Sequence, residues 1–155
     1  MPRVQTVIYL LAMAGVLGTF AAPAQGAPLA TFDTCFAAAA NRYGVSADLL
    51  RAIAHVESAG DPNAQTFYDD GSSDTGLMQI NSFWHDKLAP FGIEPRDLFD
   101  PCISIHVGAW VLAQEVRRFG YTWEAIGAYN AGPSAHPDRR QRRLRYAQRV
   151  YRFLP

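Results

Sequence analysis

The chain has 155 residues, of which 49% are hydrophobic and 18% are charged, and its formal net charge is zero at pH 7. This balance excludes an intrinsically disordered chain, and the length fits one globular domain. No segment of roughly 20 to 50 residues repeats, which excludes a repeat architecture. The charge is unevenly spread, because acidic residues predominate from Asp33 to Glu124, whereas seven arginines and no acidic residue follow Asp138.

The first 26 residues have the pattern of a secretory signal peptide. A positive charge on Arg3 precedes an apolar run from Val7 to Phe20, and small residues of the A-x-A type follow. The run is shorter than the ~20 apolar residues of a spanning helix, so a membrane anchor is the weaker interpretation. We therefore expect cleavage between Ala24 and Ala27 and export to the periplasm. Residues 27–155 are expected to form one domain.

Helix signals begin soon after this segment. Four successive alanines favour a first helix that opens near Asp33 and runs to Tyr43, with Gly44 at its end. Ser46 is the expected N-cap of a second helix, which Gly60 and the following Asp-Pro pair stop. The polar stretch from Asn63 to Thr75 lacks the spaced ligands of an EF-hand, so we expect a solvated loop or a small hairpin there.

The second half of the chain continues the helical pattern. Asp100 followed by proline is typical of a helix start, and Thr122 is a suitable N-cap. Gly108 and its neighbour Ala109 would allow another helix to approach closely. Together with apolar spacing, these signals predict helices over 82–91, 101–119, 123–129 and from about 138 onward.

Apolar side chains on these last helices suggest which faces are buried. The long helix is expected to bury Ile105, Ala109, Leu112, Val116 and Phe119. The inner side of the last helix is expected to carry Leu144, Ala147, Val150, Tyr151 and Leu154, with arginines on most of the rest. The sum is a mainly α domain of five to seven helices.

Two cysteines, Cys35 and Cys102, stand 67 positions apart. In an exported protein an even pair predicts a disulfide, and two buried free thiols are the weaker alternative. The chain-entropy estimate for a loop of this length is about 4 kcal/mol at most. We therefore expect a bridge between the starts of two helices.

Glu57 lies near the end of the second predicted helix, on the same face as Leu50 and Ile53. A carboxyl group in apolar surroundings raises its pKa and holds its proton, which prepares it as a general acid. The alternative is a glutamate paired with an arginine at a helix end. Glu57 by itself does not decide between the two interpretations.

Three short motifs place Glu57 in a wider pattern. They are Ile53-Ala54-His55-Val56-Glu57-Ser58, Gly76-Leu77-Met78-Gln79-Ile80 and Gly127-Ala128-Tyr129-Asn130-Ala131-Gly132. In this order and spacing, the chain resembles the soluble-type lytic transglycosylases from about Cys35 to Tyr151. It is most similar to the specialised members that serve type III and type IV secretion, conjugation and pilus systems, through Asp33-Thr34-Cys35-Phe36 and Asp100-Pro101-Cys102.

The resemblance implies a lysozyme-like helical fold with a Cys35–Cys102 disulfide. It implies that Glu57 is the sole catalytic acid and that Ser58, which follows it, has a structural role. The other positions that it implies are Thr66 (a serine in many relatives), Met78 and Gln79 in the sugar cleft, Tyr129 and Asn130 facing the acid, where the tyrosine can hydrogen-bond it, and Tyr146 on the C-terminal helix. Ser104 stands where the subgroup often has asparagine.

The implied reaction is cleavage of the β-1,4 bond between N-acetylmuramic acid and N-acetylglucosamine in peptidoglycan, with a 1,6-anhydro product. Such an enzyme would open the wall locally for an envelope-spanning machine, whose components would be its partners. A muramidase of the same fold would need a second carboxylate, for which Asp69, Asp70 and Asp74 are candidates. A non-catalytic wall-binding assembly factor is the third alternative.

Other ligands are not expected. The four histidines show no paired metal-ligand spacing and no H-E-x-x-H motif, so we predict no metal and no cofactor. Nucleic acid is not an expected partner of an exported protein. The basic C-terminal segment could meet anionic wall polymer, lipid head groups or an acidic partner, although a solvated helix face is the commoner explanation. We expect a monomer.

Overall fold

A computed structural model of the chain describes residues 28–155. The predicted signal peptide and its cleavage site lie outside these residues. In the described part, helices dominate, as the sequence predicts. The α-helices are α1 (Asp33–Tyr43), α2 (Ala47–Ser58), α3 (His85–Leu88), α4 (Pro101–Phe119), α5 (Trp123–Ala131) and α6 (Pro137–Tyr151), and short 3-10 helices cover Leu29–Phe32, Ser82–Trp84, Ala89–Phe91 and Pro95–Phe99.

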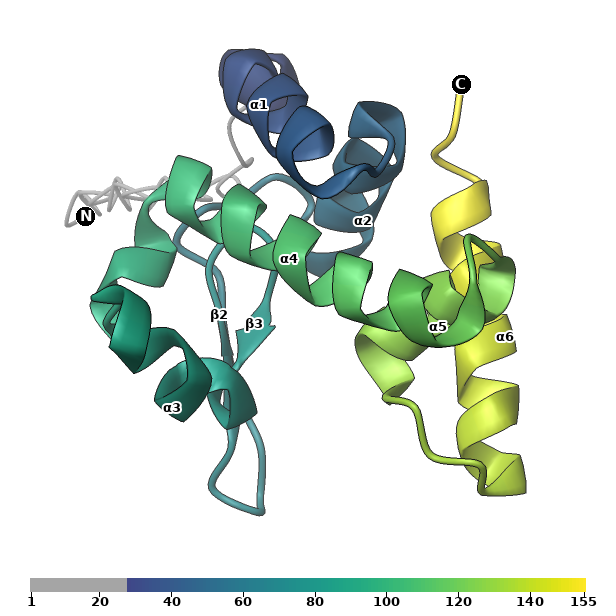
Figure 1. The fold of residues 1–155 in the computed structure, drawn as a ribbon. Coiled ribbons are helices and arrows are strands. Elements are labelled where there is room, and N and C mark those ends of the chain that lie inside the picture. Colours follow the sequence, from purple (N-terminus) through teal and green to yellow (C-terminus); the bar gives the residue numbers. More distant parts are fainter. Residues whose placement is uncertain (1–27) are drawn as a thin grey trace, which may run out of the picture.

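Helix α4 crosses the middle of the molecule, and the other elements pack around it (Figure 1). Helices α1 and α2 lie above α4, the strands and α3 lie below it, and α5 and α6 pack together at its C-terminal end. The C-terminal residues return to α2, where the rings of His55 and Phe153 are 4.1 Å apart. Helix α4 thus contacts both the sheet and the pair formed by α5 and α6.

The polar stretch after α2 forms a hairpin, which confirms that part of the expectation. Strand β1 (Gln65–Phe67) pairs antiparallel with β2 (Ser73–Thr75). A third strand, β3 (Ile80–Asn81), pairs antiparallel with β2, so the sheet order is β1-β2-β3. This third strand was too short to predict from alternation. It brings Asn81 opposite Asp74.

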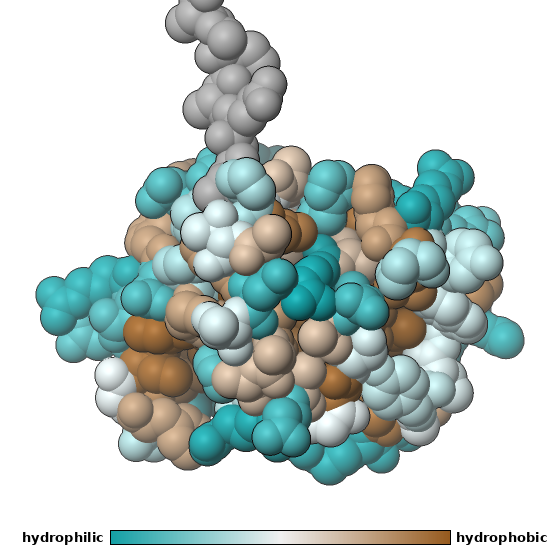
Figure 2. Space-filling model, turned by 90° about the horizontal axis from the view of Figure 1, so that it is seen from above, coloured by the Kyte–Doolittle hydropathy of each residue, from teal (hydrophilic) through white to brown (hydrophobic). Residues whose placement is uncertain are grey.

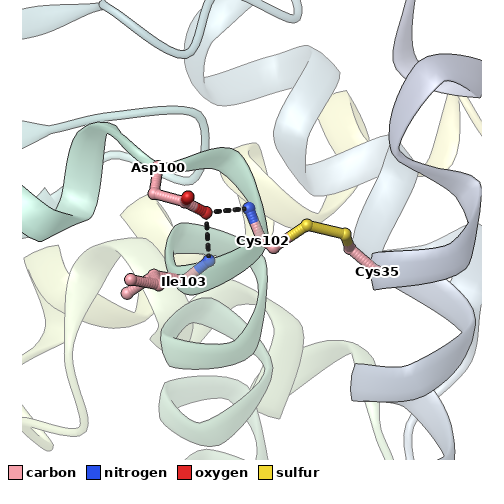
Figure 3. Close-up of a disulfide and its surroundings, with 4 residues drawn as sticks. All are labelled: Cys35, Asp100, Cys102 and Ile103. Carbon is pink, nitrogen blue, oxygen red and sulfur yellow. Dashed lines mark hydrogen bonds between the residues drawn. A yellow bond between two sulfur atoms is a disulfide. The ribbon is translucent and has the colours of Figure 1, made fainter.

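The disulfide prediction is confirmed, and Figure 3 shows its surroundings. The bridge joins Cys35 in α1 to Cys102 in α4, with their Cα atoms 5.2 Å apart. Asp100 caps the same end of α4, because its carboxylate accepts hydrogen bonds from the backbone N–H groups of Cys102 (2.8 Å) and Ile103 (3.0 Å). The cap and the bridge together fix where α4 begins.

The segment predicted as one helix over 82–91 is interrupted. It consists of the four-residue helix α3 between two 3-10 turns. The Asn81 side chain accepts a hydrogen bond from the Phe83 N–H at 2.9 Å, which starts a tight turn instead of an α-helix. Pro90 cannot donate a backbone hydrogen bond, so it cannot continue a helix from α3.

Helix α6 buries only part of the expected set of residues. Ala147 and Val150 are buried as expected, but Leu144 is 48% exposed and Tyr151 is 65% exposed. Their places on the buried face are taken by Arg143 and Tyr146, which stand at helical spacing with Ala147 and Val150 and are 3% and 2% exposed. On α4, Ile105, Ala109 and Leu112 are fully buried as expected, whereas Val116 and Phe119 are half-buried.

The close approach expected at Gly108 involves a side chain and not a helix. A Cβ atom on Gly108 would lie 2.7 Å from Cε of Met78. The close contact between helices occurs at Gly127 in α5, where a Cβ atom would lie 2.4 Å from the backbone oxygen of Arg143 in α6. This contact explains why the third motif begins with glycine.

The surface seen from above mixes hydrophilic and apolar residues in small groups (Figure 2). Several large apolar side chains are exposed over the whole described surface, among them Phe67, Phe83, Phe91 and Trp123. None of the helices in residues 28–155 combines the length and the apolar character that crossing a membrane requires.

Candidate active site

A cleft of about 1110 Å³ runs beneath α4. Its walls come from the end of α2, the hairpin, the segment around α3, one face of α4, the end of α5, and the start of α6. Glu57, Gln79, Tyr129 and Asn130 are among the residues that line it. The three sequence motifs therefore meet in one cavity, although up to 75 positions separate their residues.

Glu57 lies on the cleft wall in the surroundings that its spacing predicts. Leu50 and Ile53, on the same face of α2, are fully buried. The Tyr146 hydroxyl donates a hydrogen bond to Glu57 Oε1 at 2.5 Å. Burial raises the pKa of Glu57 from 4.5 to about 7, and the negative charge of Asp74 adds to the increase, whereas the Tyr146 hydrogen bond and Arg149 oppose it. Near neutral pH this carboxyl group can both release and take up a proton.

The second motif forms a tight turn beside Glu57. Gly76 has φ +79°, and a Cβ atom there would lie 2.0 Å from the backbone oxygen of Leu98, so only glycine fits. Gln79 also has a positive φ of 45°. Its side-chain amide donates to the carbonyl oxygens of Ala64 (3.0 Å) and Gly76 (2.9 Å), which hold this unfavourable conformation in place.

Hydrogen bonds from three helices fix the same turn. The Ser58 hydroxyl in α2 donates to Leu77 O at 2.8 Å, and the Met78 N–H donates to Ser104 Oγ in α4 at 3.1 Å. The Tyr129 hydroxyl in α5 donates to Met78 O at 2.8 Å. The turn therefore connects the helices that form the cleft. Ser58, the residue after Glu57, bonds it directly to the end of α2.

The roles of two tyrosines differ from what the resemblance implies. Tyr129 does not bond the acid, since its one hydroxyl proton goes to Met78 O. The bond to Glu57 comes from Tyr146. Burial raises the pKa of both phenols well above their usual value, so both remain proton donors.

Two of the expected cleft residues do not line the cleft with their side chains. Met78 is fully buried, and its side chain packs against Gly108. Thr66 is exposed on β1, and its hydroxyl donates to Gln79 Oε1 at 2.8 Å. Both act on the cleft through the turn, because Thr66 orients Gln79 and Met78 supplies backbone atoms.

The three candidate second carboxylates lie in different surroundings. Asp74 lines the cleft and accepts hydrogen bonds from Asn81 Nδ2 (2.8 Å) and the Tyr68 hydroxyl (2.5 Å). The bond to Asp74 raises the pKa of Tyr68 to about 12. Asp70 also lines the cleft, where hydrogen bonds from Ser72 lower its pKa. Asp69 is not among the lining residues.

Three aromatic residues, Phe83, Trp84 and Trp110, form a group on the cleft wall. Trp110 of α4 packs edge-on against Trp84, with ring centroids 5.2 Å apart, and Phe83 packs against Trp84 at the same distance. Lys87 Nζ lies 3.4 Å from the centroid of the Phe83 ring. The pairing of Trp84 and Trp110, 26 positions apart, has no local sequence signal.

Two buried ionisable side chains, Arg143 and Glu115, were not predicted from the sequence. Arg143 donates to Glu124 Oε1 (2.6 Å) and to the carbonyl oxygens of Gly132 (3.0 Å) and Ser134 (2.7 Å). It thereby fixes the loop between α5 and α6. Glu115 of α4 is buried on the cleft wall, where burial raises its pKa, and its Oε2 has no hydrogen-bond partner in the described part of the chain.

No group of three or more histidine, cysteine or acidic side chains in residues 28–155 is arranged to hold a metal ion. The absence of a cofactor remains a prediction.

The chain is similar to proteins named for bacterial invasion and to other curated proteins. The invasion protein IagB of Salmonella typhimurium is 47% identical over 118 residues, which cover 76% of this chain and 72% of IagB. Protein IpgF of Shigella flexneri is 40% identical over 119 residues, which cover 76% of this chain and 77% of IpgF.

A solved structure is similar in fold. An inactive mutant of the lytic transglycosylase Slt from Pseudomonas aeruginosa matches with a TM-score of 0.64 and 26% identity. The match covers 81% of this chain but only 23% of that much longer one. The lysozyme-like fold expected from the motifs is thus confirmed. Residues 34–151 match the family described as the Transglycosylase SLT domain. The chain belongs to this Transglycosylase SLT domain family.

Proposed function

We propose that the protein is a peptidoglycan lytic transglycosylase of the periplasm in which Glu57 is the catalytic acid. The observation that carries this proposal is the Glu57 carboxyl group, held by Tyr146 at 2.5 Å on the wall of a large cleft, with a pKa of about 7. A carboxyl group with this pKa can protonate a leaving oxygen and afterwards accept a proton near neutral pH.

The reaction would proceed in two proton transfers on one residue. Glu57 gives its proton to the glycosidic oxygen while the bond from that oxygen to the muramic anomeric carbon breaks, and positive charge develops on the sugar. The muramic 6-hydroxyl oxygen then bonds to the same anomeric carbon, and its proton returns to Glu57. No water is consumed, because the nucleophile belongs to the substrate and is held close to the reacting carbon.

A hydrolysing muramidase is the second candidate, and one observation favours it. Asp74 lines the same cleft, and its charge contributes to the raised pKa of Glu57. Among the three acidic candidates, it is therefore the one to test as a second carboxylate. Two donors, Tyr68 and Asn81, hold its carboxylate oxygens in place.

The test is a digest of purified sacculi with products measured by mass spectrometry. The wild-type protein, Glu57→Gln and Asp74→Asn are compared, with circular dichroism as the control for folding. We expect anhydro products, one water lighter than hydrolysis products, from the wild type, and a loss of about 10³-fold in Glu57→Gln. Reducing-end products that disappear in Asp74→Asn would support the muramidase. Binding to sacculi without any cleavage would contradict both enzymes and favour an assembly factor.

The proposed cellular role is local opening of the wall for a secretion, conjugation or pilus machine. Its support is the similarity to IagB, which is named as an invasion protein, together with the predicted signal peptide. Deletion of the gene should reduce assembly of the machine in the producing cell, and Glu57→Gln should fail to restore it. Restoration by Glu57→Gln would contradict an enzymatic role in assembly.

A further inference from the structure

The arginine-rich segment is not explained by the proposed chemistry, yet part of it lines the cleft. Arg139 and Arg142 of α6 and Arg118 of α4 are all cleft residues, and we call these three the arginine group. Arg143, the neighbour of Arg142, stacks over the Phe119 ring at 5.5 Å. This contact places the start of α6 beside the C-terminal turn of α4, which carries Arg118.

The arginine group and the aromatic residues are separated along α4. Trp110 and Arg118 line the cleft from the same face of α4, eight residues apart, which is about 12 Å along the helix axis. The hairpin contributes acidic residues, Asp70 and Asp74, to another wall. Glu115 also lines the cleft, three residues before Arg118, and burial raises the pKa of its carboxyl group. The three arginines concentrate positive charge around the junction of α4 and α6, away from the acidic hairpin.

The arginine group is available to a ligand. None of its three guanidinium groups forms an ion pair with any residue of the described range 28–155. Arg139 donates one hydrogen bond, to Ala131 O at 3.1 Å, which orients the side chain and leaves its other N–H groups available. Arg143 is different, because it is buried and bonded to Glu124 and to the loop. The helix thus has one structural arginine among several unpaired ones.

We propose that the arginine group binds the carboxylates of the peptide stems that peptidoglycan strands carry. The proposal rests on the proposed function, since it assigns an orientation to the same substrate. A planar guanidinium pairs with a carboxylate through two parallel hydrogen bonds, and several such groups in one cleft suit an acidic peptide. A strand without stems keeps one carboxylate on each muramic acid, on the short lactyl group close to the sugar ring. A stem carries its carboxylates farther from the sugars, where arginines away from Glu57 could bind them.

The acidic hairpin gives this subsite a direction. Asp70 and Asp74 would repel a stem carboxylate on their side of the cleft, whereas the arginine group would attract it. A bound strand would then lie with its stem toward the start of α6 and its sugars against Glu57 and the aromatic residues. The enzyme would consequently prefer strands that carry peptides to strands from which an amidase has removed them.

The test compares peptide-bearing glycan strands with the same strands after amidase treatment. The variant is Arg139→Gln with Arg142→Gln. Its matched control is Arg140→Gln with Arg145→Gln, which removes the same charge from exposed positions of α6 that do not line the cleft. We expect the wild type to have the higher kcat/KM on peptide-bearing strands. The cleft variant should reduce this preference roughly tenfold, mainly through KM, and the control should keep it. An unchanged preference in the cleft variant would overturn the proposal.

A binding measurement separates this proposal from the catalytic one. The probe is a soluble disaccharide with an acidic tripeptide stem, and its reference is the same disaccharide without the peptide. Calorimetry is performed on the Glu57→Gln protein, with and without the two cleft substitutions. We expect the stem to strengthen binding, and this gain to fall roughly tenfold in the cleft variant. Stem binding in this measurement, together with no cleavage of sacculi by the wild-type protein, would contradict the proposed function alone.

Discussion

The two sides of the cleft use their polar groups differently. On the side of α2 and the Gly76–Gln79 turn, polar atoms are bonded to the protein itself, as in the bonds from Ser58, Tyr129 and Tyr146. On the side of α6, the unpaired guanidinium groups of Arg139 and Arg142 face the cleft. The first side is built to hold a few atoms in fixed positions, and the second leaves its charges for something that is not part of the chain.

This difference separates residues that look alike in the sequence. Arg142 and Arg143 are neighbours in one basic run, yet the first lines the cleft and the second is a buried part of the fixed structure. Substitutions of bonded residues should therefore affect stability more than substitutions of residues that face the cleft.

Gly76→Ala should lower the free energy of unfolding by about 4 kcal/mol. The new methyl group would overlap Leu98 O, and the positive φ adds strain for alanine. Gly71 is the matched control, because its φ is +82° but no atom lies within 4 Å of a Cβ there. Gly71→Ala should therefore cost only the strain, about 1 kcal/mol. Urea unfolding measures both, and equal losses would show that the approach of Leu98 is unimportant.

Arg143→Gln should lower the free energy of unfolding by about 3 kcal/mol, because it leaves Glu124 and two loop carbonyls without their partner. Arg142→Gln, one residue earlier, should change it by less than about 0.5 kcal/mol. The pair is compared by urea unfolding. Similar values for the two variants would remove the distinction between structural and ligand-facing arginines.

The raised pKa of Glu57 should make stability fall as the pH rises from 4.5 to about 7. In this window the folded protein binds the Glu57 proton more tightly than the unfolded chain does, so ionisation favours unfolding. We expect Glu57 to account for about 2 kcal/mol of the decline, after allowance for its partial contact with solvent. Unfolding curves at pH 4.5 and 8 should therefore differ less for Glu57→Gln. An identical difference in the variant would contradict the raised pKa.

Tyr146→Phe should reduce the rate of cleavage roughly tenfold at pH 6, since Glu57 loses the donor that positions it. The hydrogen bond lowers the pKa of Glu57, so its removal should move the alkaline limb of the rate profile from about 7 to a higher pH. Tyr129→Phe is the comparison, because Tyr129 bonds Met78 O and not the acid. The alkaline limb of the Tyr129→Phe profile should stay near pH 7. A shift in both variants would mean that the change comes from a general disturbance of the cleft and not from the bond to Glu57.

Local signals explain why much of the fold could be predicted from the sequence. Ser46, Asp100 and Thr122 cap the helices that they were expected to cap, because capping depends on residues only two or three positions away. The disulfide followed from the cysteine pair and the family resemblance. The interrupted helix around α3 was missed, since the same apolar spacing suits an α-helix and a series of 3-10 turns.

In the candidate site, Glu57 could be predicted from the sequence, but the residues that hold it in place could not all be predicted. Glu57 follows from helical spacing within α2, but which tyrosine reaches it depends on how α6 docks, 89 positions away. Arg143 was placed on the outer face because arginine is rarely buried, and only its contact with Glu124 makes burial favourable. The concentration of arginines in the cleft likewise depends on the junction of α4 and α6, which no local pattern records.

The bond between Tyr146 and Glu57 also affects when the site can be completed during synthesis. A domain generally folds as a unit, and α2 is synthesised before α6. Until α6 docks, Glu57 lacks its phenol partner, one wall of the cleft and the arginines beside it. A partly synthesised chain therefore has the acid but not its assembled surroundings, and the capacity to act on a substrate would arise only in the finished molecule.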